Sequence, residues 1–254
     1  MSTPDHSRSV ASISIVGAGR VGSAAAAAFR AAGYRVHGPF GRNDDVERAD
    51  VVLLCVPDRE IIAAAQAVRP VGAAAMLVGH TSGATPLAGI EVDFGLHPLR
   101  AFAGGEGADA FEGIGCAIAG ASPEALGVAG ELARAVGGRP FEVRDDQRAG
   151  YHAAASIASN YLVTLEAAAE TMAAASGLDG DFRTHLVPLV RGTVENWARY
   201  GPRAALTGPI ARGDHATVAR QRDAVESTAP QLLALFDELA ERTRALAMTE
   251  ESAV

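Results

Sequence analysis

Residues 12–22 read Ser12-Ile13-Ser14-Ile15-Val16-Gly17-Ala18-Gly19-Arg20-Val21-Gly22, and an alanine run at 24–28 follows them. The first five residues predict a strand, and the alanine run predicts a helix. Gly17 permits a tight turn out of the strand, Gly19 lets backbone N–H groups approach a pyrophosphate, and Gly22 lets the helix pack closely on the sheet. Strand, turn and helix occur in the order that the motif requires. All six residues of the turn are therefore predicted to bind a dinucleotide.

The composition of the chain excludes several classes of protein. Its 254 residues suffice for a substantial core, and its formal net charge of −8 offers no basic surface to a nucleic acid. The sequence contains no apolar run long enough to span a bilayer, and its first residues lack the charged and apolar regions of a signal peptide. We therefore expect a cytoplasmic protein with no nucleic-acid or membrane partner.

The cysteines and the missing lysines narrow the possible chemistry. Cys55 and Cys116 lie in apolar segments, without CxxC spacing or a neighbouring histidine, so we expect no disulfide, no metal site and no thiol nucleophile. All 22 basic residues are arginine. The chain therefore cannot form a Schiff base through lysine or use a lysine as a general acid.

The first half of the sequence alternates short apolar strands with helices. The expected strands are Ser12–Val16, Tyr34–His37, Asp50–Val56, Ala75–Val78, Val92–Leu96, Cys116–Ala119 and Pro140–Val143. The expected helices between them are Ala24–Ala32, Arg59–Val68 and Pro123–Val136. This alternation predicts an α/β fold, a Rossmann domain with a doubly wound, mainly parallel sheet, over residues 1–145.

Strand patterns end after residue 145, and residues 146–254 are expected to form an all-α domain for substrate binding and dimerisation. Four helices are expected there. They are Ala149–Ala175, Asp181–Tyr200 with a bend or cap around Pro188, a helix from the capping residue Asp214 to about Val225, and a last helix from Ser227-Thr228-Ala229-Pro230 to Met248.

The end of the second strand indicates which nicotinamide cofactor binds. An acidic residue would accept a hydrogen bond from the ribose 2′-hydroxyl of NADH, but the strand is expected to end at His37 and Gly38 without one. Arg42 follows shortly and suits the 2′-phosphate of NADPH. NADPH is therefore favoured over NADH. Asp44 or Asp45 could still serve as the acid, and Arg42 could be a solvated loop residue.

Other candidate site residues lie where strands of the sheet end, because ligands bind at the carboxyl ends of parallel strands. The third strand leads into Val56, Pro57 and Asp58, which are predicted to border the cofactor. The next strand leads into His80, Thr81 and Ser82, and the one after it into His97. Thr81 and Ser82 are assigned to the cofactor and His97 to the substrate. Each histidine could equally cap its strand.

A polar stripe marks the start of the helical half. His152, Ser156 and Asn160 are spaced i, i+4 and i+8, which places them on one side of a continuous helix. Reduction of a C=O or C=N bond needs a proton donor, and a histidine can supply the proton while serine and asparagine orient the substrate. These three are the predicted catalytic residues. A solvent-facing or interhelical polar stripe is the alternative.

A glycine- and proline-rich loop provides the last candidates. Within residues 205–214, Arg212 could clamp a carboxylate and Thr207 could donate a hydrogen bond, so both are assigned to the substrate together with Asp214. Asp214 could instead simply cap the following helix.

Four motifs together resemble one family of Rossmann-like oxidoreductases, whose helical half is a domain of unknown function of the DUF2520 type. The motifs are Gly17-Ala18-Gly19-Arg20-Val21-Gly22, Leu96-His97-Pro98-Leu99, Tyr151-His152-Ala153-Ala154-Ala155 with Asn160, and Leu206-Thr207-Gly208-Pro209-Ile210-Ala211-Arg212-Gly213-Asp214. The family is similar in layout to ketopantoate reductase, pyrroline-5-carboxylate reductase and the β-hydroxyacid dehydrogenases, whose helical domain is of the 6-phosphogluconate dehydrogenase type. The resemblance implies a nicotinamide-dependent reductase and, by analogy, a homodimer.

The chain departs from these enzymes at one position. β-Hydroxyacid dehydrogenases and ketopantoate reductase carry a Lys-x-x-x-Asn pair on this helix, and Ser156 and Asn160 stand at the matching positions. Asn160 can keep its role as a substrate or cofactor contact, but the proton must come from elsewhere, with His152 as first candidate. The expected reaction is NADPH-dependent reduction of a small 2-oxo acid, with ketopantoate leading. A cyclic imine substrate, a reduced deazaflavin as redox partner, and a nucleotide sensor without turnover remain alternatives.

Overall fold

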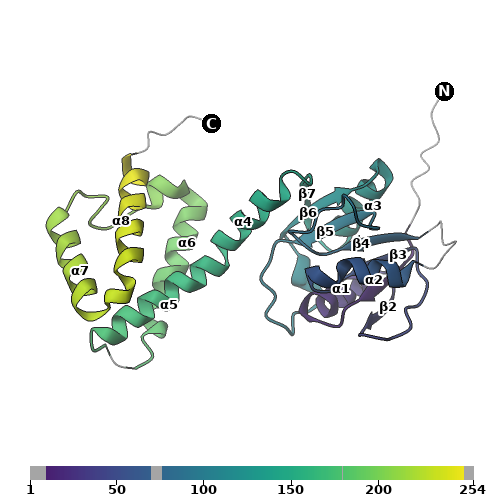
Figure 1. The fold of residues 1–254 in the computed structure, drawn as a ribbon, viewed down its shortest axis with the longest axis horizontal. Coiled ribbons are helices and arrows are strands. Elements are labelled where there is room, and N and C mark those ends of the chain that lie inside the picture. Colours follow the sequence, from purple (N-terminus) through teal and green to yellow (C-terminus); the bar gives the residue numbers. More distant parts are fainter. Residues whose placement is uncertain (1–9, 70–75, 179, 249–254) are drawn as a thin grey trace. The chain divides into compact units, whose positions relative to one another are not determined.

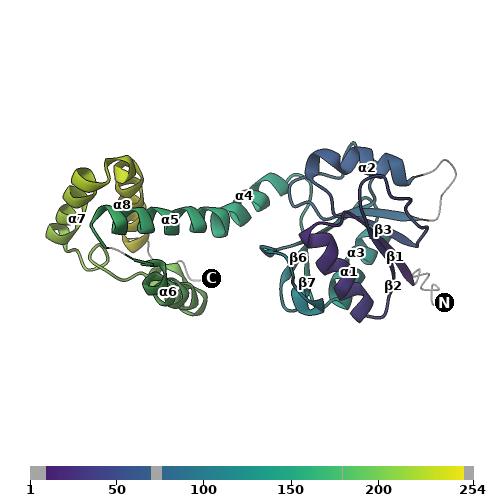
Figure 2. The same ribbon diagram turned by 90° about the horizontal axis from the view of Figure 1, so that it is seen from below.

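The computed structural model describes residues 10–69, 76–178 and 180–248. The chain forms two compact units, residues 1–159 and residues 160–254. The first unit holds the whole sheet, and the second consists of helices (Figures 1 and 2). The helix Arg148–Ala158 follows the last strand and belongs to the first unit. Each unit is described below by itself.

The first unit is built on a seven-stranded sheet with the order β2-β1-β3-β4-β5-β6-β7. Its strands are β1 (Ser12–Val16), β2 (Arg35–Phe40), β3 (Val51–Leu54), β4 (Leu77–His80), β5 (Phe94–Pro98), β6 (Gly115–Gly120) and β7 (Arg139–Glu142). Neighbouring strands are parallel except β5 and β6, which are antiparallel. The predicted α/β class and the mainly parallel, doubly wound sheet are confirmed.

Helices cover both faces of this sheet. On one face, α1 (Arg20–Ala31) and α3 (Pro123–Ala135) pack against side chains such as Ile13, Leu53 and Phe94. On the other, α2 (Ile61–Val68) packs against Val52, Leu54 and Val78. Figure 2 shows α1 and α2 on opposite sides of β1 and β3. Because both faces are covered, β3 is apolar and buried throughout, as expected for a central parallel strand.

The seven expected strands are all present, with shifted ends. β2 continues to Phe40, three residues beyond the expected end, and β5 continues to Pro98. β4 begins at Leu77, and the expected start at Ala75 lies outside the described residues. The remainder of the unit includes the 3₁₀ helices η1 (Asp58–Glu60) and η2 (Ala108–Phe111) and the helix α4 (Arg148–Ala158).

The second unit contains α5 (Asn160–Ala175), α6 (Arg183–Ala205), α7 (His215–Thr228), the 3₁₀ helix η3 (Pro230–Leu232) and α8 (Leu233–Met248). Asp214 caps α7 as expected, since its side chain accepts a hydrogen bond from Thr217 N at 3.0 Å. Pro230 opens η3 just before α8, in line with the expected proline near the first turn. Within the described residues, no helix of the chain is long and apolar enough to cross a membrane.

Two expectations about the helices were wrong. The single helix expected over Ala149–Ala175 is interrupted at Ser159, whose φ of −120° and ψ of −72° are not helical. Short polar side chains such as those of Ser159 and Asn160 compete with helical hydrogen bonds, which a count of apolar positions does not register. The second is a helix end or cap around Pro188, which instead lies inside α6. The non-helical residue of α6 is Gly201 (φ 78°, ψ 174°), followed by Pro202, and this break directly follows the expected helix end at Tyr200.

Candidate functional site

The glycine turn between β1 and α1 leaves no room for side chains at two of its positions. Gly17 has a φ of +109°, and a Cβ there would lie 2.3 Å from the carbonyl oxygen of Cys55. A Cβ on Gly22 would lie 1.9 Å from the carbonyl oxygen of Gly17. Both positions therefore require glycine so that the turn, the start of α1 and the end of β3 can touch.

Gly19 differs from these two glycines because no packing requires it. No atom lies within 4 Å of where its Cβ would be, and its backbone is extended, with a φ of −78° and a ψ of −171°. Gly19 is the N-cap of α1, and the first turn of this helix has neither a side-chain cap nor an acidic residue. The first N–H groups of α1 thus face an open space without a side-chain partner, and an anion such as a diphosphate fits there.

The turn also lies where the sheet order reverses. β1 is flanked by β2 and β3, and the chain crosses from one side of β1 to the other between them. In open α/β sheets, ligands bind outside the carboxyl ends of the strands at such a switch point. The residues predicted to bind the diphosphate, Gly17-Ala18-Gly19-Arg20-Val21-Gly22, follow β1 at this point. Both the fold and the glycine geometry therefore suit a dinucleotide at this point.

Arg42 lies closer to the glycine turn than the sequence indicated. β2 ends at Phe40, whose carbonyl oxygen accepts a hydrogen bond from Gly17 N at 2.8 Å, so Arg42 comes two residues after the strand end. Its exposed guanidinium bonds Glu60 at 2.8 Å, and Asp44 accepts a hydrogen bond from Gly41 N at 2.7 Å. An arginine on an exposed ion pair at the tip of β2 is available to a ligand phosphate.

The residues after β3 and β4 are placed by hydrogen bonds within their own loops. Val56 and Pro57 lead into Asp58, which opens η1 and is exposed. The backbone N–H and the hydroxyl of Thr81 both donate to Leu54 O, at 3.0 and 3.3 Å. The Ser82 hydroxyl oxygen accepts from the backbone N–H groups of residues 84 and 85 and is nearly inaccessible. The Ser82 side chain therefore stabilises the conformation of the loop after β4.

A cluster of polar side chains gathers at the carboxyl ends of β4 and β5. The hydroxyl of Tyr151, on α4, lies 2.6 Å from Nδ1 of His97, on β5. A Cβ on Gly83 would lie 3.0 Å from His97 Nε2 and 3.1 Å from His152 Cδ2, so both imidazoles approach the same glycine. Two predicted site residues, His97 and His152, are thereby brought together within the first unit.

The electrostatics of this cluster keep its buried histidines neutral. Burial, and after it the positive charges of His152 and Arg148, lower the pKa of His97 to about 4. Burial and Arg148 likewise lower the pKa of His80 to about 4. Burial raises the pKa of Tyr151 to about 12. Near neutral pH both imidazoles are therefore uncharged and the phenol keeps its proton.

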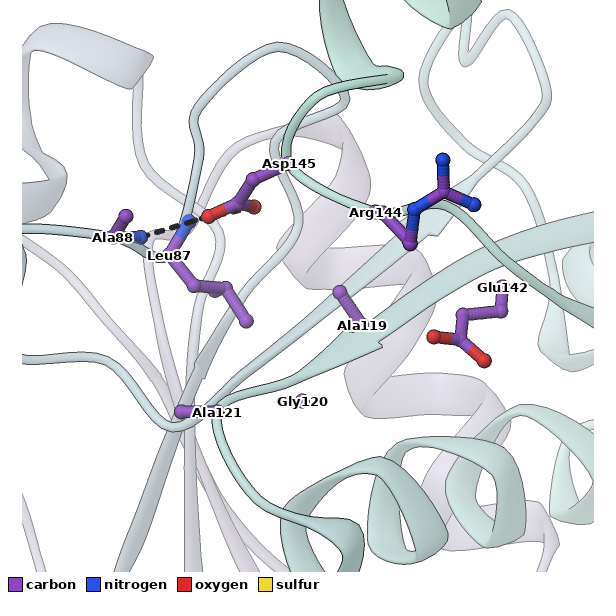
Figure 3. A pocket seen from close by; sticks show the side chains of 8 residues that line it. All are labelled: Leu87, Ala88, Ala119, Gly120, Ala121, Glu142, Arg144 and Asp145. Atoms are coloured by element: carbon purple, nitrogen blue, oxygen red, sulfur yellow. Dashed lines mark hydrogen bonds between the residues drawn. The ribbon is translucent and has the colours of Figure 1, made fainter.

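Arg148 and Asp145 were not predicted from the sequence, and they form an ion pair next to the cluster. The guanidinium of Arg148 is buried, with its Nε 2.9 Å from Asp145 Oδ1. The two oxygens of Asp145 also accept hydrogen bonds from Leu87 N (3.0 Å) and Ala88 N (2.9 Å), as Figure 3 shows. A Cβ on Gly95 would lie 2.9 Å from Arg148 Nη2, so glycine makes room for the guanidinium on the sheet. The i, i+3 spacing of Asp145 and Arg148 was the only signal in the sequence.

The remaining predicted residues are placed within separate units. Ser156 is half-buried in the middle of α4, in the first unit, and Asn160 is the first residue of α5, in the second. Thr207 and Arg212 are exposed in the loop between α6 and α7, and the Asp214 carboxylate is engaged in capping α7. The predicted stripe of three residues is interrupted by the break at Ser159.

Two cavities lie apart from the predicted site residues, although Asp145, Leu87 and Ala88 line the first of them. One of about 370 Å³, shown in Figure 3, is lined by Leu87, Ala88, Ala119, Gly120, Ala121, Glu142, Arg144 and Asp145. It lies where β6 ends, which is the opposite edge of the sheet from the glycine turn because β6 is antiparallel to β5. The other, of about 440 Å³, lies in the second unit, and its lining from α5, α7, η3 and α8 is almost entirely apolar.

Both cysteines are free thiols, and burial raises the pKa of Cys55 to about 12 and that of Cys116 to about 11. Neither is therefore a nucleophile near neutral pH. Within the described part of the chain, no group of histidine, cysteine and acidic side chains is arranged to hold a metal ion.

Several solved structures share the fold of the whole chain. BF3122 from Bacteroides fragilis, described as a candidate NADP oxidoreductase, is 21% identical over 93% of this chain and 98% of its own, with a TM-score of 0.76. Protein TM1727 from Thermotoga maritima is 22% identical over 92% of this chain and 98% of its own, with a TM-score of 0.74. Pyrroline carboxylate reductase from Plasmodium falciparum, solved with NADP bound, is 12% identical over 93% of this chain and 98% of its own, with a TM-score of 0.55.

No curated protein matches the chain. The domain of unknown function DUF2520 matches residues 114–243, which extend from the edge of β6 to α8 and include the polar residues of α4. The match covers more than half of the chain and agrees with the motifs noted in the sequence. The protein belongs to the DUF2520 family.

Proposed function

We propose that this protein is a nicotinamide-dependent reductase that transfers hydride to a small 2-oxo acid. The observation that carries the proposal is that the N-terminus of α1 at Gly19 has no side-chain cap and lies at the switch point of the sheet. Gly17 and Gly22, where a Cβ would clash with the backbone, hold the turn around it. The proposal is supported by the fold shared with a reductase solved with NADP bound. The polar cluster at β5 adds neutral hydrogen-bonding groups at the same edge of the sheet.

The cofactor would be held by the loops that follow β1, β2, β3 and β4. Its diphosphate would bind the backbone of residues 17–22, and the loops of residues 56–58 and 81–82 would border its nicotinamide half. We propose NADPH over NADH, because Arg42 can exchange its exposed bond to Glu60 for a doubly hydrogen-bonded 2′-phosphate. When bound, this cofactor supplies the hydride.

The protein's own residues would bind the second substrate and supply the proton. His152 is exposed on α4 and can exchange protons with water, which suits a general acid, while Ser156 one turn later would orient the carbonyl group. Asn160 would share that orienting role. Thr207, Arg212, Asp214 and His97 would bind the substrate, with Arg212 pairing with its carboxylate. Ketopantoate is the leading candidate for this substrate.

A cyclic imine is the second candidate substrate. Two proteins that share the fold are named as imine-type reductases, the pyrroline carboxylate reductase of Plasmodium falciparum and an imine reductase from Myxococcus stipitatus. A sensor that binds the nucleotide without turnover is the third possibility. In that case His152 would serve only local packing, and its removal would change no property of the bound nucleotide.

We also propose that the protein forms a homodimer through its helical unit. None of the described residues of α6 is buried within the chain, although the helix carries large apolar side chains. Leu189, Trp197 and Tyr200 are 65%, 57% and 56% exposed. Apolar surface of this size on one helix is unusual for a monomer and is typical of an interface.

The test is NADPH oxidation by the purified protein, with ketopantoate and a cyclic imine offered in parallel. We expect turnover with ketopantoate that falls by about 100-fold or more in His152→Ala, because a general acid contributes a factor of that order. The matched control is His215→Ala, an exposed histidine at the start of α7, which should keep full activity. Arg42→Ala should weaken NADPH binding by about tenfold and leave NADH binding unchanged.

Each alternative predicts a different result. Turnover with the imine alone would move the substrate assignment to the second candidate. Saturable NADPH binding without turnover of either compound would overturn the 2-oxo acid proposal and favour the sensor. If His215→Ala lost activity as well, the loss in His152→Ala would reflect reduced stability of the protein and not the removal of a catalytic group.

A further inference from the structure

The hydrogen bond between Tyr151 and His97 determines where the proton of the imidazole lies. The hydroxyl is 2.6 Å from Nδ1, and the two rings meet edge to face with centroids 5.6 Å apart and an interplanar angle of 84°. Phe141 packs against the other side of the tyrosine, with ring centroids 5.9 Å apart. The phenol is therefore held in one orientation, and its hydroxyl is directed at a single nitrogen of His97.

The protonation states of the two rings determine which of them can donate the hydrogen bond. Burial keeps the His97 imidazole uncharged, since its pKa is about 4, and keeps the phenol protonated, since the pKa of Tyr151 is about 12. A neutral imidazole carries one N–H group and one acceptor nitrogen. A protonated phenol that donates to Nδ1 requires this nitrogen to be unprotonated, which leaves the imidazole proton on Nε2.

We propose that Tyr151 is a positioning residue that fixes His97 as the Nε2–H tautomer, so that His97 offers a permanent hydrogen-bond donor to the reducible oxygen or nitrogen of the substrate. This inference rests on the proposed reductase function and refines it. His97 was assigned above only to substrate binding, and Tyr151 had no role.

The surroundings of Nε2 support such a donor. A Cβ on Gly83 would lie 3.0 Å from Nε2 of His97, 2.9 Å from its Cε1 and 3.1 Å from Cδ2 of His152. A Cβ at this position would be too close to both rings, so the glycine is what allows His97 and His152 to approach the same point of the backbone. A substrate bound beside Gly83 would meet the N–H of His97 and the ring of His152 together.

The two histidines would then have different tasks. Hydride transfer to a carbonyl carbon leaves negative charge on its oxygen, and a fixed donor that needs no reorganisation stabilises this charge as it develops. His97 is suited to this because an imidazole of low pKa stays neutral and keeps its N–H directed at the site. The exposed His152 completes the reaction by giving up its own proton, so that the O–H bond forms as the N–H bond of His152 breaks.

The first test measures the tautomer directly, in the intact protein without substrate. Nitrogen-15 NMR of histidine-labelled protein at neutral pH should show His97 with a protonated Nε2 and a hydrogen-bonded, unprotonated Nδ1. In Tyr151→Phe the Nδ1 acceptor loses its partner, and we expect a mixture of tautomers. Tyr161→Phe removes an exposed hydroxyl, on α5, and should leave the His97 signals unchanged.

The second test measures the consequence for catalysis. With the substrate that the NADPH oxidation assay identifies, Tyr151→Phe should lower kcat by about tenfold and leave the dissociation constant of NADPH unchanged. His97→Gln, whose amide can place an N–H near the position of Nε2, should retain more activity than His97→Ala. Unfolding curves that match those of the wild type would show that Tyr151→Phe is folded.

The outcomes separate the inference from the proposed function. A protonated Nδ1 on His97 in the wild-type protein would overturn the inference whatever the activity. An unchanged kcat in Tyr151→Phe would overturn the positioning role even if the tautomer were as proposed. An Nε2–H tautomer without turnover of any substrate would overturn the proposed function, and with it the donor role, but leave the pairing of Tyr151 with His97 intact.

Discussion

The glycine turn after β1 and the polar cluster after β5 lie at the same edge of one sheet, yet they are built in opposite ways. The turn is defined by missing side chains, since Gly17 and Gly22 leave no room for a Cβ beside backbone oxygens. The cluster is defined by side chains that are present and mutually oriented, as in the bond between Tyr151 and His97. Adding atoms at Gly17 or Gly22 should therefore disrupt the turn, whereas removing a hydrogen-bonding partner should disrupt the cluster.

The largest expected effect comes from adding atoms to the turn. Gly22→Val would place its Cβ 1.9 Å from the carbonyl oxygen of Gly17, and α1 would have to move off the sheet. We expect a loss of more than about 4 kcal/mol in the free energy of unfolding, at the upper end of what single substitutions cost. Chemical denaturation measured by circular dichroism checks this value.

Gly19→Ala is the matched comparison within the same turn. Nothing lies within 4 Å of the new methyl group, and the extended backbone accepts alanine, so stability should change by less than about 1 kcal/mol. The methyl group would occupy the space where a diphosphate approaches, so NADPH affinity should fall by about tenfold or more. Equal losses of stability in Gly19→Ala and Gly22→Val would contradict the distinction between a packing glycine and a ligand glycine.

The same contrast explains what the sequence could predict. The strands and the turn are local: a short apolar run followed by correctly spaced glycines predicted β1, a helix after it and the class of the sheet. The helix α1 begins at Arg20, four residues before the expected start at Ala24. The end of β2 was placed three residues early, because Gly38 and Pro39 have the composition of a turn although the strand continues through them. The class of the sheet and the position of the glycine turn therefore followed from the sequence alone.

The internal arrangement of the cluster could not be predicted in this way. Tyr151 and His97 are 54 positions apart, and only the packing of α4 on the sheet brings their atoms together. The sequence did place His97 at a strand end and His152 on a helix, but it contained no signal that both would meet at Gly83. Likewise, Arg148 resembled an ordinary surface arginine until its burial over Gly95 was known.

The second expected effect comes from removing the carboxylate of Asp145, which pairs with the buried Arg148 beside the cluster. Asp145 accepts hydrogen bonds from two backbone N–H groups and from the buried Arg148, so Asp145→Ala leaves three donors without a partner. We expect a loss of about 4 kcal/mol in the free energy of unfolding. Arg148→Met should cost less, about 2 kcal/mol, because Asp145 is partly exposed and keeps its two backbone donors.

The order of these two losses, measured by urea denaturation, is the decisive observation. If Arg148→Met cost more than Asp145→Ala, the buried guanidinium rather than the carboxylate would organise the loop at Leu87. Arg148→Met should also raise the pKa values of His80 and His97, since both are lowered in part by its charge.

The last expected effect distinguishes the two regions by pH, because the cluster contains two buried histidines and the glycine turn contains none. The pKa values of His80 and His97 are about 4 when folded, against an ordinary value near 6.5 when unfolded. Above pH 6.5 both states are neutral at these residues, and the folded protein has its full stability. As the pH falls from 6.5 towards 4, the unfolded chain binds protons that the folded chain excludes, so the free energy of unfolding decreases.

The loss should reach about 3 kcal/mol for each histidine near pH 4, and urea denaturation across this range measures it. His97→Gln should remove roughly half of the pH dependence, because glutamine does not titrate, while the variant Gly19→Ala should show the wild-type slope. A slope that persists unchanged in His97→Gln would mean that His97 has the same pKa in the folded and the unfolded protein. That result would contradict the lowered pKa from which a neutral donor at the end of β5 is argued.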